Sequence, residues 1–357
     1  MGDTAAAQFD CRRCTLGVAE IHQCRRYRRL SVKFWSLDIA SGTALALLVV
    51  WFHEALIPST VPLPWAFLLS MSIIMVLQFV LSMFIGVATG SLEAMIPGTF
   101  VAMGAMLVAL VPMREMSLKF VAGAIVGFAI SLGFVLADAM LRGWSPGNVS
   151  ERRVCPVSNP PSFTLPTPAW IYDLLEGAGA RRRACPQRRL FAKMGEQVLF
   201  VAAGSGLNFV HFPPRRSIIA IDVNPDMLHR ARNRAKSYDG ILRLMEADVQ
   251  KLPFEDASFY TVATASTFCS VPDPSEGLSE LCRVLKPGGN LLMFEHVRSR
   301  STLIALNQDI MNFIMRILGA NVNRDTAAAV RNAGFVVDRI GNAYLDVFLA
   351  IEGHKPR

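Results

Sequence analysis

The stretch 198-VLFVAAGSGLN-208 decides the fold of the second half of this chain. Its apolar run, Val198 to Val201, is followed by a turn of small residues and by the start of a helix, which brings backbone N–H groups close to a ligand. Phe200 and Ala202 stand where such turns usually have a carboxylate and a glycine. The stretch favours a nucleotide-type binding turn with an altered sequence over a plain strand and turn.

Short apolar runs alternate with helical segments after this stretch. The strand-like runs are Val198–Ala202, Ile218–Asp222, Leu242–Glu246, Tyr260–Ala265 and Leu291–Glu295. Segments of helical period, each closed by glycine, precede the third and fifth runs. This alternation predicts an α/β domain with a mostly parallel sheet, in which ligands bind outside the carboxyl ends of the strands.

Small and polar residues follow the predicted strand ends, namely Gly204, Ser205, Gly206, Asn208, Asp222 and Asp248. Asp222 ends the second strand, where a carboxylate can accept both hydroxyls of a ribose. Asp248 ends the third, near the expected place of an adenine amine. Because no phosphate-binding lysine follows the glycines, a nucleoside without a pyrophosphate fits better than NAD or ATP.

Residues 198–355 resemble class I S-adenosylmethionine (SAM)-dependent methyltransferases, in the subgroup of phospholipid N-methyltransferases, ubiquinone/menaquinone methyltransferases and membrane thiol methyltransferases. The matching segments, in family order, are "VLFVAAGSGLNFVHFPP", "AIDVNPDML", "EADVQKLPFEDASF", "CSVPDP", "ELCRVLKPGGNLLMFEHV" and "NRDTAAAVRNAGF". The resemblance implies a Rossmann-like domain with a mostly parallel seven-stranded sheet, and SAM as the cofactor.

The resemblance also implies roles for single residues. Gly204 and Gly206 approach the methionine part and ribose of SAM. Ala202, Ser205 and Asn208 are further cofactor-binding candidates beside them, and Ser205 and Asn208 can help to hold the cofactor's ammonium. Asp222 binds the ribose hydroxyls, with Val223 as a cofactor-binding neighbour. Asp248 and Val249 hold adenine, and Phe268 to Ser270 face the transferred methyl. The family carboxylate missing at Phe200 helps to hold the cofactor's ammonium, so a weakened grip on SAM is expected.

Methyl transfer is an in-line displacement, and an amine or thiol acceptor must lose a proton. Glu295 and His296, at the carboxyl end of the fifth predicted strand, are the candidates for general base or acceptor positioning. The alternative is that Glu295 only binds backbone groups and that His296 faces solvent.

The first half of the chain has the composition of a membrane domain. The whole chain is 52% hydrophobic and only 18% charged, and residues 39–111 carry just two formally charged side chains, Glu54 and Glu93. Four runs approach the ~20 residues that a membrane-spanning helix needs: Ile39–Ile57, Pro64–Thr89, Leu92–Val111 and Leu118–Leu141. We therefore predict an α-helical membrane bundle of about four transmembrane helices, residues 36–143, in a lipid bilayer.

Basic residues on both sides of this bundle set its predicted orientation. They occur in the tail, residues 1–35, and after Arg142, so an even number of spans places the tail and the second domain in the cytoplasm. Residues 144–168 are rich in proline and form a linker, and the second domain covers residues 169–357. Because the arginines cluster beside the apolar half, the net charge of +8 favours an anionic membrane surface, and we expect no nucleic-acid partner.

The tail also contains a possible zinc-binding set, Cys11, Cys14, His22 and Cys24, although the last two lie closer together than in a standard knuckle. The tail can equally be disordered, and we expect no other metal site.

These observations lead to one main hypothesis, a membrane-embedded SAM-dependent methyltransferase for a membrane-associated or lipophilic acceptor. A phospholipid amine is favoured, followed by a quinone precursor or a small thiol. One alternative is a catalytically silent SAM-binding sensor coupled to the bundle. Another is metal or metalloid handling with methylation, with the tail cysteines as receiver. The sequence does not define the oligomeric state.

Overall fold

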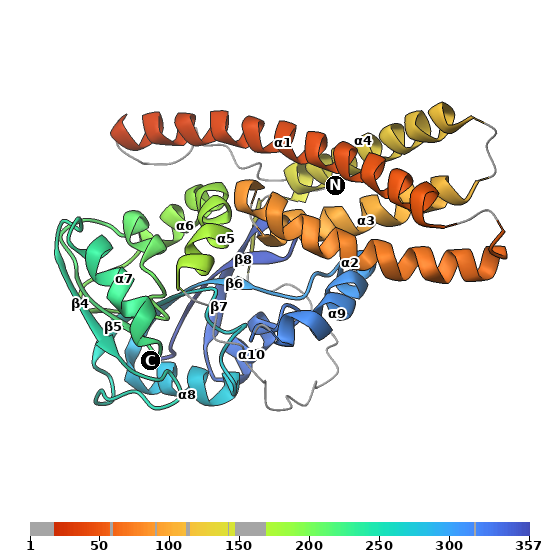
Figure 1. Ribbon diagram of the computed structural model, residues 1–357. Coiled ribbons are helices and arrows are strands. Elements are labelled where there is room, and N and C mark those ends of the chain that lie inside the picture. Colours follow the sequence, from red (N-terminus) through yellow and green to blue (C-terminus); the bar gives the residue numbers. More distant parts are fainter. Residues whose placement is uncertain are drawn as a thin grey trace, which may run out of the picture. The chain divides into compact units, whose positions relative to one another are not determined.

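The computed structural model describes residues 18–57, 60–89, 91–111, 115–141, 143–146, 169–317 and 319–357 (Figure 1). It divides into two compact units. The helical unit comprises Thr15–Met140 and Leu174–Arg182, and the sheet unit includes Leu141–Asp173 and Arg183–Arg357. Each unit is described by itself below.

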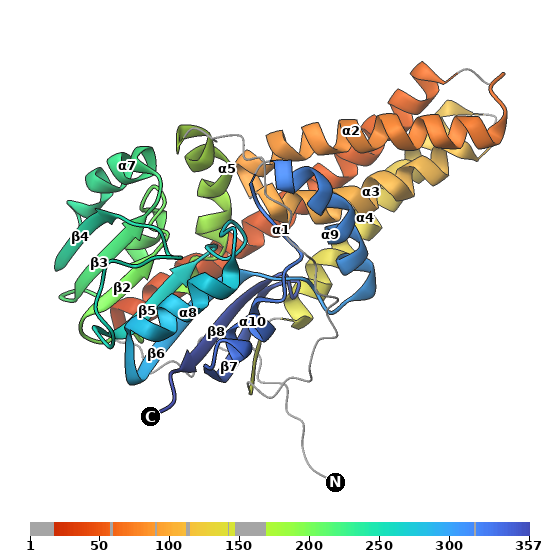
Figure 2. The same cartoon turned by 90° about the horizontal axis from the view of Figure 1, so that it is seen from below.

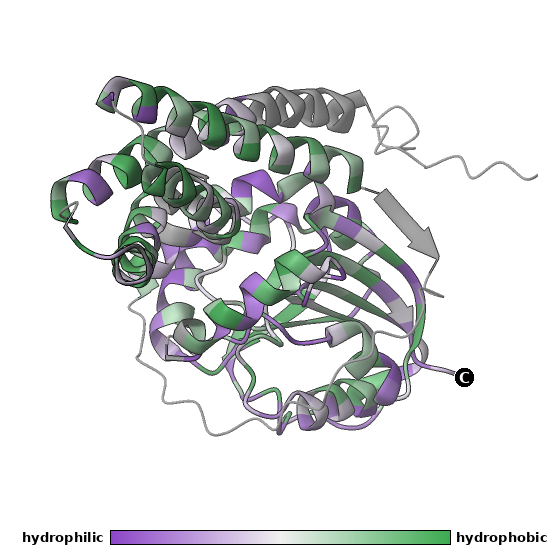
Figure 3. Ribbon diagram, turned by 90° about the vertical axis from the view of Figure 1, so that its right-hand side faces the viewer, coloured by the Kyte–Doolittle hydropathy of each residue, from purple (hydrophilic) through white to green (hydrophobic). Residues whose placement is uncertain are grey.

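The helical unit is built from α1 (Val18–Leu56), α2 (Leu63–Thr89), α3 (Ser91–Leu110) and α4 (Met116–Leu141). Apolar residues dominate α2, α3 and α4 on all sides, which Figure 3 shows as largely green ribbons. In the described part of the chain, three helical stretches are long and apolar enough to cross a membrane: Lys33–Leu56, Pro64–Ser82 and Met116–Leu141. The apolar stretch of α3, Ala94–Leu110, is shorter, so three of the four predicted spans reach the required length.

Small residues let α4 lie close to α1. A methyl group at Gly127 would lie 2.6 Å from Ala46 Cβ, and one at Gly123 would lie 2.8 Å from Val50 Cγ2. Backbones can approach this closely only where side chains are small, which is a frequent way of packing helices in membranes. The charge of Glu54 is met by Lys119, with 2.5 Å between Oε1 and Nζ.

The sheet unit contains eight strands in the order β1-β7-β8-β6-β5-β2-β3-β4, most of which can be followed in Figure 2. Their bounds are β1 Gly143–Pro146, β2 Val198–Val201, β3 Ser217–Asp222, β4 Ile241–Glu246, β5 Phe259–Ala265, β6 Leu285–His296, β7 Val336–Tyr344 and β8 Phe348–His354. The strands from β2 to β6 pair in parallel, whereas β8 is antiparallel to both β6 and β7.

The sheet is therefore mixed, and it has one strand more than the seven we predicted. The antiparallel pair arises because only three residues separate β7 from β8, and so short a turn can join only antiparallel strands. The additional strand, β1, pairs with the edge strand β7 and comes largely from the segment predicted as a linker. Proline is compatible with such an edge position, because an edge strand has one side without ladder hydrogen bonds.

Helices cover both faces of the sheet. α6 (Ala184–Phe191) and α7 (Pro225–Ala235) lie on one face, and α8 (Pro274–Val284) and α10 (Thr326–Asn332) on the other. Figure 1 labels α6, and Figure 2 shows α7, α8 and α10. Both α7 and α8 start at a side-chain cap followed by proline: Asn224 accepts from the N–H of Asp226, and Asp273 from that of Ser275. The remaining elements are α5 (Ala169–Arg182), the 3-10 helix η2 (Leu207–His211) and α9 (Thr302–Ile317).

Candidate active site

The turn after β2 has the left-handed backbone that its glycines permit. Gly204 has φ +54° and Gly206 φ +85°. A methyl group at Gly206 would lie 2.8 Å from the ring of Phe209, so packing requires glycine there. At Gly204 the nearest atom would be Cε1 of Tyr172, 3.9 Å away. Position 204 therefore leaves open space beside the backbone, which is where a ligand can approach.

Asp222 ends β3 directly beside this turn. Its Oδ2 accepts a hydrogen bond from Gly204 N at 2.7 Å and its Oδ1 accepts one from Asn224 N at 2.9 Å. Burial raises the pKa of the Asp222 carboxyl, and these backbone hydrogen bonds oppose that shift. Since an ionised carboxylate has about four lone-pair positions, it keeps accepting capacity for a ligand's hydroxyl group beside these backbone donors.

The second predicted cofactor carboxylate, Asp248, lies at the same end of the sheet as Asp222. β3 and β4 pair in parallel with Asp222 opposite Glu246, so Asp248 follows at the neighbouring strand end. Asp248 is exposed and accepts from Gln250 N, whereas Val249 is buried and Val223 is 65% exposed. The parallel register thus brings the predicted ribose and adenine residues to one edge of the sheet.

Asp173 of α5 is a residue of this region that the sequence analysis missed. Its carboxylate accepts a hydrogen bond from the Ser205 hydroxyl and forms ion pairs with Arg230 Nη1 at 2.9 Å and Arg234 Nη2 at 3.0 Å. Burial alone would raise the pKa of Asp173, but hydrogen bonds from Arg234, Ser205 and Arg230 hold it below its ordinary value. Two arginines spaced i, i+4 on α7 were the available signal, because such residues share a helix face.

Glu295 supports the backbone turn that follows β5. The side chain is fully buried, and its oxygens accept from Thr264 Oγ1 at 2.6 Å, Thr267 N at 3.0 Å and Phe268 N at 3.1 Å. Burial raises the pKa of Glu295 to about 7, although these hydrogen bonds favour the carboxylate. Because its oxygens are occupied inside the fold, Glu295 does not fit the general-base role that was one of our expectations.

Arg324 binds the same turn through its carbonyl groups. Its guanidinium donates to the carbonyls of Phe268 and Val271, the second at 2.7 Å. The Phe268 side chain is 1% exposed, and a methyl group at Gly277 would lie 3.2 Å from its Cε1. Phe268 is therefore a core side chain, and only its backbone belongs to the turn that we expected to face the transferred methyl.

His296 is buried, which contradicts our alternative expectation that it faces solvent. It is 4% exposed, and its ring stacks on Phe348 with 4.2 Å between the ring centroids. The guanidinium carbon of Arg183 also lies 4.2 Å from the centroid of the Phe348 ring. The imidazole is thus inside the fold, at the carboxyl end of β6.

Phe200, the departure from the family pattern, lies in an aromatic core. It is fully buried, with its ring centroid 5.7 Å from that of Phe191 and 4.7 Å from that of Phe212, both in edge-to-face geometry. A carboxylate at this position would be buried among these rings, without space for a hydrating water molecule. Asn208 is half-buried in η2, the short helix that directly follows the glycine turn.

Comparison with known proteins identifies the family of this chain. A sequence model described as "Methyltransferase domain" matches residues 199–293. Demethylmenaquinone methyltransferase of Deinococcus radiodurans is 33% identical over 168 residues, which cover 44% of this chain and 69% of that protein. The chain belongs to the SAM-dependent methyltransferases.

Two further relatives differ in name and in coverage. The ubiquinone/menaquinone biosynthesis C-methyltransferase of Pseudomonas paraeruginosa is 31% identical over 140 residues, which cover 37% of this chain and 55% of that protein. Phosphatidylethanolamine N-methyltransferase of Cereibacter sphaeroides is 31% identical over 149 residues, covering 40% of this chain and 72% of that protein.

The residues of the methyltransferase fit its cofactor, SAM. The open side of Gly204 leaves room beside the turn, and the buried Asp222 keeps lone pairs for ribose hydroxyl groups. The ammonium of SAM would find no carboxylate at position 200, because Phe200 is part of the core. The fit is therefore good at the ribose and reduced at the amino group.

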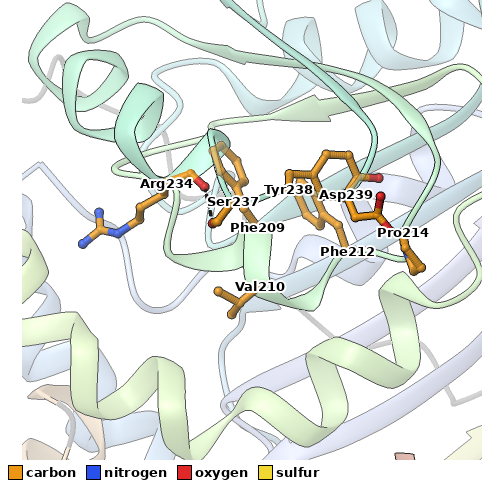
Figure 4. A pocket seen from close by; sticks show the side chains of 8 residues that line it. All are labelled: Phe209, Val210, Phe212, Pro214, Arg234, Ser237, Tyr238 and Asp239. Atoms are coloured by element: carbon orange, nitrogen blue, oxygen red, sulfur yellow. Dashed lines mark hydrogen bonds between the residues drawn. The ribbon is translucent and has the colours of Figure 1, made fainter.

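A pocket also opens away from these residues. It is lined by Phe209, Val210, Phe212, Pro214, Arg234, Ser237, Tyr238 and Asp239 (Figure 4). Pro214 and Asp239 precede β3 and β4, so the pocket lies toward the amino ends of these parallel strands, opposite the edge that holds Asp222. It contains none of the predicted cofactor residues.

The possible zinc residues remain outside what the structure describes. Cys11 and Cys14 lie outside the described residues, and the side chains of His22 and Cys24 in α1 are not described. The side chain of Glu93 in α3 is likewise not described. Among the described residues, no group of three or more His, Cys, Asp or Glu side chains has an arrangement that could hold a metal ion.

Proposed function

We propose that this methyltransferase is embedded in a membrane and methylates a lipophilic acceptor that it takes from the bilayer. The observation that carries the proposal is the presence, in one chain, of a methyltransferase domain and three helical stretches long and apolar enough to cross a membrane. The names of the relatives, which refer to menaquinone, ubiquinone and phosphatidylethanolamine, support an acceptor of this class. We favour a phospholipid amine, then a quinone precursor or a small lipophilic thiol.

The proposed orientation places the tail, residues 1–35, and the methyltransferase domain in the cytoplasm. Basic residues in the tail and between the two domains support this orientation, because positive charge is enriched on the cytoplasmic side of membrane proteins. The anionic cytoplasmic leaflet would attract the same residues.

The chain's own residues divide the work of the proposed reaction. SAM supplies an electrophilic methyl group on a sulfonium. Asp222 and the open turn at Gly204 bind and orient the ribose side of the cofactor. Glu295 and Arg324 fix the turn after β5, so that the acceptor meets a rigid backbone. His296 is the proposed base for an amine or thiol acceptor.

The test uses the full chain in nanodiscs made of phosphatidylethanolamine and phosphatidylglycerol, with methyl-labelled SAM. Label is expected in the extracted phosphatidylethanolamine, and Asp222→Ala should abolish it. Demethylmenaquinone and a long-chain alkyl thiol, added separately, test the other two acceptor classes. Transfer only to water-soluble acceptors, or loss of the protein from membranes washed with carbonate, would contradict the proposal.

A second candidate is a silent SAM-binding module that reports the cofactor level to the helical unit. The observation that favours it is Phe200, which removes a carboxylate from the ammonium of SAM. Saturable SAM binding without transfer to any of the three acceptor classes would support this candidate. Measurable turnover on one of them would eliminate it.

A further inference from the structure

Helix α9 exposes an apolar face. Leu303, Leu306, Ile310 and Phe313 are 67%, 56%, 55% and 78% exposed. Their spacing of three, four and three residues places them along one side of the helix. Single exposed apolar side chains are ordinary, but four in one row on a helix indicate a surface that binds something apolar. We call these four residues the α9 face.

Buried amides hold this face outward. On the inner side of α9, Gln308 accepts from Ser299 N at 2.7 Å and donates to the carbonyls of Val297 at 2.9 Å and Val322 at 2.8 Å. Asn312 accepts from Val322 N at 2.9 Å. Although Ile304 and Met311 are also buried on this side, turning the helix to bury the α9 face would break all four hydrogen bonds and leave polar groups unpaired. The apolar face is therefore fixed in an exposed position by the fold.

The segment that follows α9 reaches the candidate active site. Asn321 N donates to the carbonyl of Cys269 at 2.7 Å, and Arg324 donates to that of Val271. Both acceptors lie in the turn after β5, which Glu295 holds from the other side. Whatever the α9 face binds is thus connected through a few residues to the turn expected to meet the acceptor.

Positive charge lies near both ends of the α9 face. Arg300 precedes the helix, and its side chain is 51% exposed while it pairs with Asp346. Arg316 stands in the last turn. An apolar row with arginines at its ends matches the interface of an anionic bilayer, where apolar side chains enter the acyl region and cations remain among the headgroups.

We propose that the α9 face inserts into the surface of an anionic lipid bilayer and holds the turn after β5 at the lipid phase that contains the acceptor. This inference rests on the proposed function, because it needs a bilayer beside the methyltransferase domain. It names one occupant, lipid, and a second copy of the chain is an outcome that the experiment can report.

The experiment places the photoreactive residue p-benzoylphenylalanine at Phe313 in the full chain, in nanodiscs of phosphatidylcholine and phosphatidylglycerol with labelled phospholipid. A lipid adduct is expected at position 313. The matched control is Ile241, a 56% exposed apolar residue at the start of β4, where no adduct is expected. Unchanged SAM binding shows that each variant is folded.

A third position separates failure of this inference from failure of the proposed function. Ile125 is 62% exposed on α4 and lies within a stretch long enough to span a membrane. An adduct at 125 without one at 313 would overturn the inference and leave the proposed membrane embedding intact. Adducts at neither position would overturn both, and a cross-linked protein dimer from position 313 would show that another copy covers the α9 face.

Discussion

At the scale of single residues, Ala202 is the most informative position in the glycine turn. Its φ is +56°, a left-handed conformation that costs an L-residue with a Cβ about 1 kcal/mol or more. We therefore expect Ala202→Gly to raise the free energy of unfolding by about 1 kcal/mol and to leave SAM affinity equal or tighter.

The matched control is Ala203→Gly, at a buried neighbour without a positive φ, where we expect destabilisation of about 0.5–1 kcal/mol. Thermal unfolding of the two variants in detergent compares them. Destabilisation by Ala202→Gly would show that the turn does not have this backbone.

Substitutions of Phe200 test whether the family pattern or the local packing decides which side chain position 200 accepts. The pattern alone suggests that Phe200→Glu would improve the hold on SAM. The structure predicts the opposite, because a carboxylate among the rings of Phe191 and Phe212 would be buried without a partner, at a cost of several kcal/mol. Phe200→Leu should cost only about 1–2 kcal/mol. A folded Phe200→Glu protein that binds SAM more tightly would refute this account.

Glu295 and His211 give opposite pH dependences of stability. Burial raises the pKa of Glu295 from 4.5 to about 7, so the fold holds an extra proton and its stability falls as pH rises through that window. Burial, and secondarily the charge of Arg188, lowers the pKa of His211 from 6.5 to about 4, so stability rises with pH between these values. Each contribution is about 3 kcal/mol at its full extent, and the two nearly cancel.

Single substitutions should separate these contributions. The thermal unfolding midpoint of Glu295→Gln should increase as the pH is raised from 4.5 to 6.5. That of His211→Gln should decrease over the same pH range. The slopes are the readout, because either substitution can shift the midpoint at every pH. Parallel slopes in the two variants would show that these groups do not titrate as described.

At the scale of elements, the sequence analysis found the parts that carry strong local patterns. The strands predicted at residues 198–202, 218–222, 242–246 and 260–265 match the structure to within one residue at each end, because each is a short apolar run bounded by turn residues. The strand predicted at 291–295 is longer in the structure, where β6 begins at Leu285. The strands β1, β7 and β8 were not located, because their pairing depends on distant partners and on a three-residue turn. The same limit applies to the site: Asp222 could be inferred from its strand end, whereas the bonds from Glu295 to the turn after β5 exist only in the folded sheet.

The link between α5 and the glycine turn makes an element-scale prediction. Asp173→Asn removes the charge that holds Arg230 and Arg234, whose side chains are 41% and 34% exposed. Because Asp173 also accepts a hydrogen bond from the Ser205 hydroxyl, the substitution should loosen the glycine turn. We expect the free energy of SAM binding to weaken by about 1 kcal/mol, which is roughly a fivefold loss of affinity.

The control is Asp256→Asn, which removes an ion pair with Arg283. The Asp256 side chain is 80% exposed. SAM affinity should not change in this variant, as calorimetric titration can determine. Equal SAM affinity in Asp173→Asn and the unaltered protein would mean that α5 does not support the turn.

At the scale of the whole molecule, composition predicted a membrane half and a soluble half. The described structure contains three spanning-length helical stretches where four were expected, because the apolar part of α3 starts only at Ala94. Length and apolar composition can be read from any sequence, whereas the arrangement of two units around a bilayer depends on lipid. The membrane proposal therefore needs the lipid experiments above, while the cofactor site can be tested in detergent.

The most direct test of the central claim is calorimetric titration of the full chain with SAM and with S-adenosylhomocysteine. We expect saturable binding that Asp222→Ala abolishes and that Asp226→Ala, an exposed aspartate four residues later, retains. Binding that survives Asp222→Ala, or no binding by folded unaltered protein, would contradict the assignment of the cofactor site to the carboxyl ends of β2 and β3.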